Sequence, residues 1–220
     1  MSKFFRFFVG ISIFYLLLIA IGKEDLAWYF KPLLLPGLLL ATNESKDFPT
    51  KRWLLLSLSF SWLGDVILMF ADKGEIYFIL GLVSFLIAHI LFIVLFIKQE
   101  TLNKPNKLLF GIGILAVASY LYTMLTILLP TLGDLQIPVS VYAFVISLML
   151  VMAIRGALTW RSPLNILILN GAIAFVTSDS ILAINKFFTA LPNASLLIMS
   201  TYIIAQYLIT FGILKLNEKK

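Results

Sequence analysis

Two aspartates lie inside long apolar stretches of this chain of 220 residues. Asp65 falls in "SWLGDVILMF" and Asp179 falls in "GAIAFVTSDSILAI". A charged side chain at the middle of a membrane span costs about 2.5 to 3.5 kcal/mol on insertion scales, so such a residue usually has a function. Two carboxyl groups, one protonated and the other ionised, can act as a general acid and a general base. We therefore predict that Asp65 and Asp179 are catalytic.

Other polar residues are expected at similar depths in the apolar stretches. With a rise of about 1.5 Å per residue along a helix, Lys31 and Tyr142 fall near the level of the two carboxylates, and His89 and Gln206 fall one to two turns deeper. Tyr202 and Gln206 are four residues apart, so they share one helix face. The candidate substrate-binding or supporting residues are Lys31, His89, Tyr142, Ser178, Tyr202 and Gln206.

Each of these residues also has a purely structural interpretation. Either aspartate could form a buried ion pair with Lys31 that only fixes the packing of the helices. His89 is the sole histidine, and one histidine with two aspartates makes a sparse zinc site. We therefore predict that His89 is a hydrogen-bonded interior residue, and we predict no metal.

The chemistry expected from these residues is attack by a water molecule that a carboxylate activates. The sequence contains no cysteine, so thiolate chemistry is excluded. It also contains no G-x-S-x-G motif, which argues against an acyl-enzyme mechanism of the lipase type. Proton transfer between carboxyl groups and water needs no cofactor, and we predict none.

The elements that must position these residues are membrane-spanning helices. The chain is 61% hydrophobic and 13% charged, with a mean hydropathy of +1.02, and its apolar runs approach or exceed the roughly 18 to 20 residues that cross a bilayer. We predict an all-α membrane protein with one polytopic membrane domain over residues 1–220. The eight predicted spans are about 4–21, 26–42, 53–70, 76–97, 108–129, 138–155, 164–186 and 195–214.

The basic residues predict how these spans are oriented. Lys and Arg near span ends stay on the cytoplasmic side. With the N-terminus inside, the 17 Lys and Arg all fall on that side except Lys23, Lys31, Lys73 and Lys186. Both termini are therefore predicted to be cytoplasmic. The net charge of +6 follows from the same bias, so we do not predict nucleic-acid binding.

A weak internal repeat divides the predicted spans into two sets of four. "GDVIL" at 64–68 is similar to "SDSIL" at 178–182, and "FLIAHIL" at 85–91 is similar to "YIIAQYL" at 202–208. These pairs align Asp65 with Asp179 and His89 with Gln206. The alternative is coincidence among helices rich in Ile, Leu and Ala. Because two matched pairs occur in the same order, we predict a parallel repeat of four plus four helices.

Six sequence blocks, taken in order, resemble the YhhN-like family of eight-span membrane proteins, which includes lysoplasmalogenase. Each block is weak alone, but the ordered set extends from about residue 31 to 209 and is fairly specific. The blocks are "KPLLLPGLLLA" at 31–41, "SWLGDVILMF" at 61–70, "FILGLVSFLIAHILFI" at 78–93, "PVSVYAF" at 138–144, "GAIAFVTSDSILAINKF" at 171–187 and "TYIIAQYLI" at 201–209.

This resemblance implies hydrolysis of the vinyl ether bond of lysoplasmalogen, a 1-alkenyl glycerophospholipid without its second chain. The products would be a fatty aldehyde and the glycerophospho-headgroup. The two aspartates thought to be catalytic in the family fall on Asp65 and Asp179, and the expected partners are a lysophospholipid substrate and the bilayer. A compact chain with short loops would suit a bacterial inner membrane, and a eukaryotic relative would be expected in the endoplasmic reticulum.

Two other functional classes stay open on the sequence alone. Parallel repeats and intramembrane acids suit a small-solute or proton-coupled transporter as well as an enzyme. A membrane scaffold without chemistry would tolerate replacement of both aspartates by asparagine. The few Gly and Pro interruptions of the predicted spans, with Pro32 and Pro36 as the main exception, argue against transport.

Overall fold

The computed structural model describes residues 3–218 and contains only helices within that range, as the sequence predicts. The short 3₁₀ turns are η1 (Lys31–Leu33), η2 (Leu129–Thr131) and η3 (Gly133–Leu135). The α-helices are α1 (Lys3–Ala20), α2 (Glu24–Phe30), α3 (Pro36–Asn43), α4 (Lys51–Leu68), α5 (Glu75–Ile97), α6 (Lys107–Leu128), α7 (Gln136–Thr159), α8 (Leu164–Phe187) and α9 (Ala194–Asn217).

Six of these helices are long and apolar enough to cross a membrane, namely α1 and α5 to α9. The prediction of a multi-pass α-helical membrane protein is confirmed to that extent. Helix α4 has the length of a span but carries Lys51, Arg52 and Asp65 within its 18 residues. The remaining predicted span, 26–42, is not one continuous helix. Eight spans therefore stay a prediction.

Two prolines interrupt the segment predicted as the span 26–42. The chain forms α2, then η1, then α3, with Pro32 in η1 and Pro36 at the first residue of α3. A proline has no backbone N–H, so Pro36 cannot donate to the carbonyl of Pro32 four residues earlier. The indole Nε1 of Trp62 in α4 donates to that carbonyl instead, at 2.8 Å. The break is thus stabilised by a side chain from a neighbouring helix.

The chain divides into two compact units, unit 1 up to Leu95 and unit 2 from Phe96 onward. Unit 1 holds α1 to α4 and nearly all of α5, and unit 2 holds α6 to α9. The division falls at the end of the fourth predicted span, where the two halves of the predicted repeat meet. The repeat itself and the single membrane domain over residues 1–220 stay predictions.

Unit 1 is built around α4. Helix α1 packs against α2 and α3, and both α3 and η1 pack against α4. Helix α5 lies against α4: the hydroxyl of Ser84 in α5 donates to the carbonyl of Phe60 in α4 at 2.7 Å. Gly64 allows this close approach, since a Cβ there would lie 2.6 Å from the ring of Phe85.

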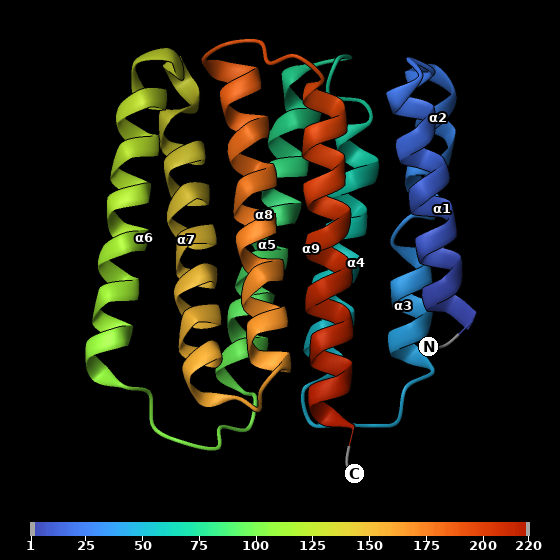
Figure 1. Ribbon diagram of the computed structural model, residues 1–220. Helices are drawn as coiled ribbons and strands as arrows, with labels where there is room; N and C mark the ends of the chain where they lie inside the picture. Colours follow the sequence, from blue (N-terminus) through green and yellow to red (C-terminus); the bar gives the residue numbers. More distant parts are fainter. Residues whose placement is uncertain (1–2, 219–220) are drawn as a thin grey trace. The chain divides into compact units, whose positions relative to one another are not determined.

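Unit 2 is an up-and-down arrangement in which α6, α7, α8 and α9 follow one another (Figure 1). Helices α8 and α9 approach most closely at two glycines. A Cβ on Gly171 of α8 would lie 2.8 Å from Cγ1 and 3.0 Å from the backbone nitrogen of Ile209, and a Cβ on Gly212 of α9 would lie 2.5 Å from Ile168. Small residues therefore hold α8, which carries Asp179, tightly against α9.

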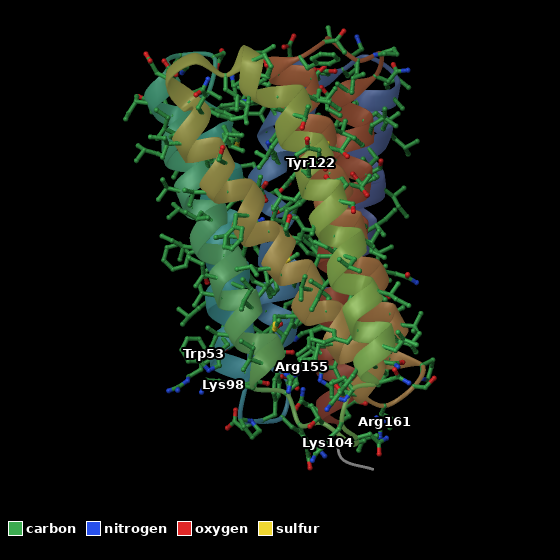
Figure 2. All side chains as sticks on the ribbon, turned by 90° about the vertical axis from the view of Figure 1, so that its left-hand side faces the viewer. Trp53, Lys98, Lys104, Tyr122, Arg155 and Arg161 are labelled. Atoms are coloured by element: carbon green, nitrogen blue, oxygen red, sulfur yellow. The ribbon has the colours of Figure 1, made fainter. Side chains whose placement is uncertain are left out.

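Basic residues gather at one end of unit 2. Figure 2 shows Lys98, Lys104, Arg155 and Arg161 at this end. Arg161 also donates to the carbonyl of Lys215 in the last turn of α9, at 3.2 Å. This is the asymmetry expected from retention of Lys and Arg on one side of a membrane. Which side it faces stays a prediction.

The close contact between α8 and α9 can be tested with a pair of glycine substitutions. Gly171→Ala forces the helices apart, so we expect a loss of about 1–3 kcal/mol in the free energy of unfolding. Gly111→Ala on α6 meets open space, so it should be neutral or gain up to about 1 kcal/mol from helix propensity. Thermal unfolding in one detergent measures both. An equal gain in both variants would contradict the packing described here.

Candidate functional site

Asp65 lies on the buried face of α4. Leu54, Leu58, Ser61 and Asp65 recur at intervals of three or four residues, which places them on one side of the helix. Asp65 is only 3% exposed. The face that positions Asp65 is therefore the one that α4 presents to the interior.

Two groups from other elements of unit 1 lie within electrostatic reach of Asp65. One is the ammonium group of Lys31 in η1, and the other is the hydroxyl of Tyr15 in α1. Lys31 is the first residue of the turn η1 in the broken segment. The bond from Trp62 to Pro32 ties η1 to α4 three residues before Asp65. Unit 1 thus brings a carboxyl group, an ammonium group and a phenol to one place.

Asp179 in unit 2 is held by a tyrosine from the neighbouring helix. The hydroxyl of Tyr142 in α7 donates to Oδ2 of Asp179 in α8. Asp179 is partly exposed, unlike Asp65. The sequence singled out both residues, and the structure joins them directly.

The residues on either side of Asp179 are bonded to two further helices. Ser178 donates to the carbonyl of Ile198 in α9 at 2.9 Å. Ser180 is hydrogen-bonded to Tyr120 of α6, and its own proton goes to the carbonyl of Val176. Because a serine hydroxyl has a single proton to give, Tyr120 must be the donor to Ser180. Three consecutive residues of α8 are thus fixed by α9, α7 and α6.

Tyr202 and Gln206 lie together on the buried face of α9. The side-chain nitrogen of Gln206 donates to the hydroxyl of Tyr202 at 3.3 Å. The ring of Tyr202 packs edge-on against Phe175 of α8, with the ring centres 5.5 Å apart. His89 is fully buried in α5 of unit 1. His89, Ser178, Tyr202 and Gln206 are therefore buried side chains of long helices, whereas Lys31 lies in the short turn η1.

Sequence patterns missed two tyrosines that the structure places beside the aspartates. Tyr15 is in α1, and Tyr120 is in α6. Neither lies in one of the blocks that carried the family resemblance. Counting the depth of each tyrosine along its span, as was done for Tyr142, could have identified them as phenols near the level of the carboxylates.

The site residues offer proton-transfer groups rather than a ligand set for a metal. Among residues 3–218, no group of three or more His, Cys, Asp or Glu side chains is placed to hold a metal ion. Each unit provides a carboxyl group with a phenol near it, and unit 1 adds the ammonium group of Lys31. Such groups can donate, accept and relay protons.

Comparison with known proteins supports the resemblance found in the sequence blocks. A model of the YhhN family matches residues 26–213, a range that contains both aspartates. No solved structure matches the chain.

Curated relatives match most of the chain. Lysoplasmalogenase TMEM86A of Homo sapiens is 31% identical over 174 residues, which cover 77% of this chain and 68% of that protein. Lysoplasmalogenase TMEM86B of Homo sapiens is 31% identical over 203 residues, covering 89% and 80%. Lysoplasmalogenase of Mycobacterium tuberculosis is 31% identical over 167 residues, covering 74% and 60%.

The bond between α6 and α8 predicts coupling between two substitutions. Tyr120→Phe and Ser180→Ala should each lower the free energy of unfolding by about 1 kcal/mol, the usual net value of one hydrogen bond. The double variant should lose less than the sum of the two. Tyr122→Phe is the control, because Tyr122 lies on the same helix but is 74% exposed. Thermal unfolding of the wild type, the two single variants and the double variant measures this coupling. If the losses in the free energy of unfolding are additive, Tyr120 and Ser180 make no bond.

Proposed function

This chain belongs to the YhhN family, and from that premise we propose that it is an intramembrane hydrolase that cleaves the vinyl ether bond of lysoplasmalogen. The products are a fatty aldehyde and the glycerophospho-headgroup. The proposal is supported chiefly by the human and mycobacterial relatives named lysoplasmalogenase, which match most of the chain. The two aspartates within the matched range, each on a long helix, supply the chemistry that this reaction needs.

The reaction requires one proton donor, one proton acceptor and one water molecule. A carboxyl group gives its proton to the outer carbon of the C=C bond, and the remaining carbon becomes an oxocarbenium ion. Water adds to that carbon and loses a proton to the second carboxylate. The product of this addition is a hemiacetal. Breakage of the C–O bond then releases the aldehyde, because the hemiacetal hydroxyl loses its proton and the departing glycerol oxygen takes one up. Glycosidases pass through a similar cation with two carboxyl groups.

We assign these two carboxyl groups to Asp65 and Asp179. Tyr142 orients the carboxylate of Asp179 through its hydrogen bond. Ser178 holds α8 against α9, and the charge of Asp65 interacts with Lys31. We further propose that Lys31, His89, Tyr202 and Gln206 orient water or bind the oxygens of the glycerol and the headgroup, with no cofactor.

The protein would work inside the membrane where its substrate lies. Six apolar helices make it a multi-pass membrane protein, and the basic end of unit 2 would face the cytoplasm under the positive-inside rule. If the source is bacterial, we place it in the inner membrane. A lysophospholipid has one chain anchored in the bilayer, so it would reach the site through the lipid phase.

The first test is aldehyde release from 1-alkenyl lysophospholipid by the purified protein in detergent. Asp65→Asn and Asp179→Asn should each lower kcat at least about a hundredfold, the effect expected on removal of a general acid or base. Asp72→Asn and Asp134→Asn are matched controls, because both aspartates are exposed and lie outside the α-helices. Equal activity in all four folded variants would remove the aspartates from the mechanism.

The bond to Asp179 predicts a smaller effect for its tyrosine partner. Tyr142→Phe removes one hydrogen bond from the carboxylate but leaves the carboxyl group in place. We expect kcat to fall about tenfold, since one such bond is worth roughly 1 to 2 kcal/mol. Tyr122→Phe should leave kcat unchanged. A full loss of activity in Tyr142→Phe would instead make the phenol itself a catalytic acid.

A small-solute or proton-coupled transporter is the second candidate. The broken segment at residues 31–36, with Lys31 near Asp65, is the feature that favours it, because transporters often bind solutes at interrupted helices. Uptake of solute or protons into liposomes distinguishes the two functions. If the wild type releases no aldehyde while a control lysoplasmalogenase does, and liposomes show uptake that Asp65→Asn abolishes, transport replaces hydrolysis.

A further inference from the structure

The end of unit 2 at which α7 stops carries an excess of basic side chains. Three segments contribute to it, namely 96–107, 155–165 and 211–218. Their acidic residues are Glu100 and Glu218, and Glu218 is already paired with Lys215 at 2.7 Å. The basic residues of the same segments are Lys98, Lys104, Lys107, Arg155, Arg161 and Lys215.

Hydrogen bonds hold these three segments together. The backbone N–H of Leu102, in the loop after α5, donates to the carbonyl of Thr159 at the end of α7, at 2.9 Å. Arg161 follows α7 and donates to the carbonyl of Lys215 in α9. The basic side chains therefore belong to one connected surface of unit 2, and Figure 2 shows four of them at this end.

Three of these basic residues have no acidic partner. No carboxylate among residues 3–218 forms an ion pair with Arg155, Arg161 or Lys104. Arg155 is only partly exposed, and it lies four residues before the end of α7. A guanidinium group binds carboxylate or phosphate oxygens with paired N–H groups. The charge at this end is therefore available to an anion from outside the chain.

Trp160 supplies a buried N–H donor at the same place. It is 5% exposed, and its Nε1 has no acceptor among the described residues. The ring lies against Gly156, the residue after Arg155, where a Cβ would be 2.2 Å from the ring. Phe96 packs edge-on against the same ring, with the ring centres 5.7 Å apart. Because buried N–H groups are nearly always bonded, this donor indicates an acceptor that the chain itself does not provide.

Retention of Lys and Arg on one side of the membrane explains only part of this arrangement. It accounts for the number of basic residues at this end. It does not account for a buried indole N–H without an acceptor beside a partly buried guanidinium group. An anion bound between the two groups accounts for both.

The surface beside the basic residues is apolar. Leu102 is 63% exposed and Leu108 is 73% exposed. Helix α6 begins at this end, at Lys107, and it is the least buried of the six apolar helices. Leu108, Ile112 and Leu115 recur at intervals of four and three residues, so they form one exposed face of α6.

Helix α6 is also in contact with the part of α7 that carries Arg155. A Cβ on Gly113 of α6 would lie 2.8 Å from the side chain of Ile154, the residue before Arg155. Basic groups and an apolar helix surface are thus adjacent. This combination fits a phospholipid, which has a charged headgroup and apolar chains, better than it fits a small soluble anion.

We propose that this end of unit 2 binds an anionic phospholipid of the surrounding bilayer, with its acyl chains along α6. Basic sites between membrane helices are known to hold such headgroups. Phosphate oxygens accept hydrogen bonds and carry the negative charge that the site lacks. The groups that bind the phosphate are Lys104, Arg155, Arg161 and the indole N–H of Trp160.

This lipid site is distinct from the surroundings of Asp179. Asp179 lies fifteen residues beyond Leu164, the first residue of α8, which is about 22 Å along the helix. In a lysoplasmalogen the phosphate and the vinyl ether belong to the same glycerol unit. One molecule therefore cannot place its phosphate at Arg161 and its vinyl ether at Asp179. The lipid site does not depend on the proposed hydrolysis.

Lipid binding can be measured as a shift in the melting temperature of the full chain in detergent. Short-chain phosphatidylglycerol is the probe, and phosphatidylcholine with the same chains is the neutral comparison. Phosphatidylglycerol should raise the melting temperature more, because a ligand of the folded state stabilises it. About 1 M NaCl should remove most of this difference by screening. An equal shift with both lipids in the wild type would overturn the proposal.

Three substitutions locate the binding site. Arg155→Gln should raise the apparent Kd for phosphatidylglycerol about tenfold, as expected for one lost charged hydrogen bond. Trp160→Phe keeps a ring against Gly156 but removes the N–H, and it should weaken binding severalfold. Lys46→Gln is the control, because it removes the same charge from an exposed residue of unit 1. If Lys46→Gln weakens binding as much as the other two, net charge alone attracts the lipid and the site is wrong.

A soluble anion is distinguished from a lipid with inorganic phosphate and glycerol 3-phosphate. At the concentration at which phosphatidylglycerol acts, neither should shift the melting temperature. If either gives the full shift, and Trp160→Phe abolishes that shift, the site binds a free anion and the assignment to a lipid is wrong. These results do not depend on aldehyde release, so a failure of the proposed hydrolysis leaves the lipid site standing.

Discussion

A polar group inside a hydrocarbon layer has no bulk water to bind, so the helices of this protein must satisfy such groups among themselves. The proline break between α2 and α3 shows how this is done. Pro36 removes the donor for the carbonyl of Pro32, and Trp62 supplies another from α4. The break is therefore tolerated, and Lys31, whose charge interacts with that of Asp65, lies within it. One hydrogen bond to a backbone carbonyl thus links the broken segment to the helix that carries Asp65.

The same constraint shapes the surroundings of Asp179 in unit 2. Residues 178 to 180 of α8 each bond to a different helix, so the carboxyl group is held on a segment that cannot easily rotate. Close packing of α8 on α9 at Gly171 fixes the segment further. A proton-transfer group must keep its direction toward the substrate. Architecture that satisfies polar groups here also orients the proposed catalytic carboxylate.

The proposed function depends on a few polar groups within a largely apolar chain. The two sites provide carboxyl groups, phenols and the ammonium group of Lys31, and the proposed hydrolysis can proceed with these groups and water.

Much of the fold and part of the site could be predicted from the sequence. Hydropathy alone placed the span 76–97 on Glu75–Ile97 and the span 164–186 on Leu164–Phe187, because an apolar run of that length is stable in a bilayer only as a helix. Asp65 and Asp179 were evident because charge is costly in such runs.

Only the tertiary structure decided which side chains meet. The partner of Pro32 is thirty residues away, and Tyr120 lies sixty residues from Ser180 in a helix without a motif. Sequence periodicity describes the face of one helix, but it holds no information about which other helix that face contacts. Packing between helices alone determined these contacts, and with them the surroundings of each aspartate.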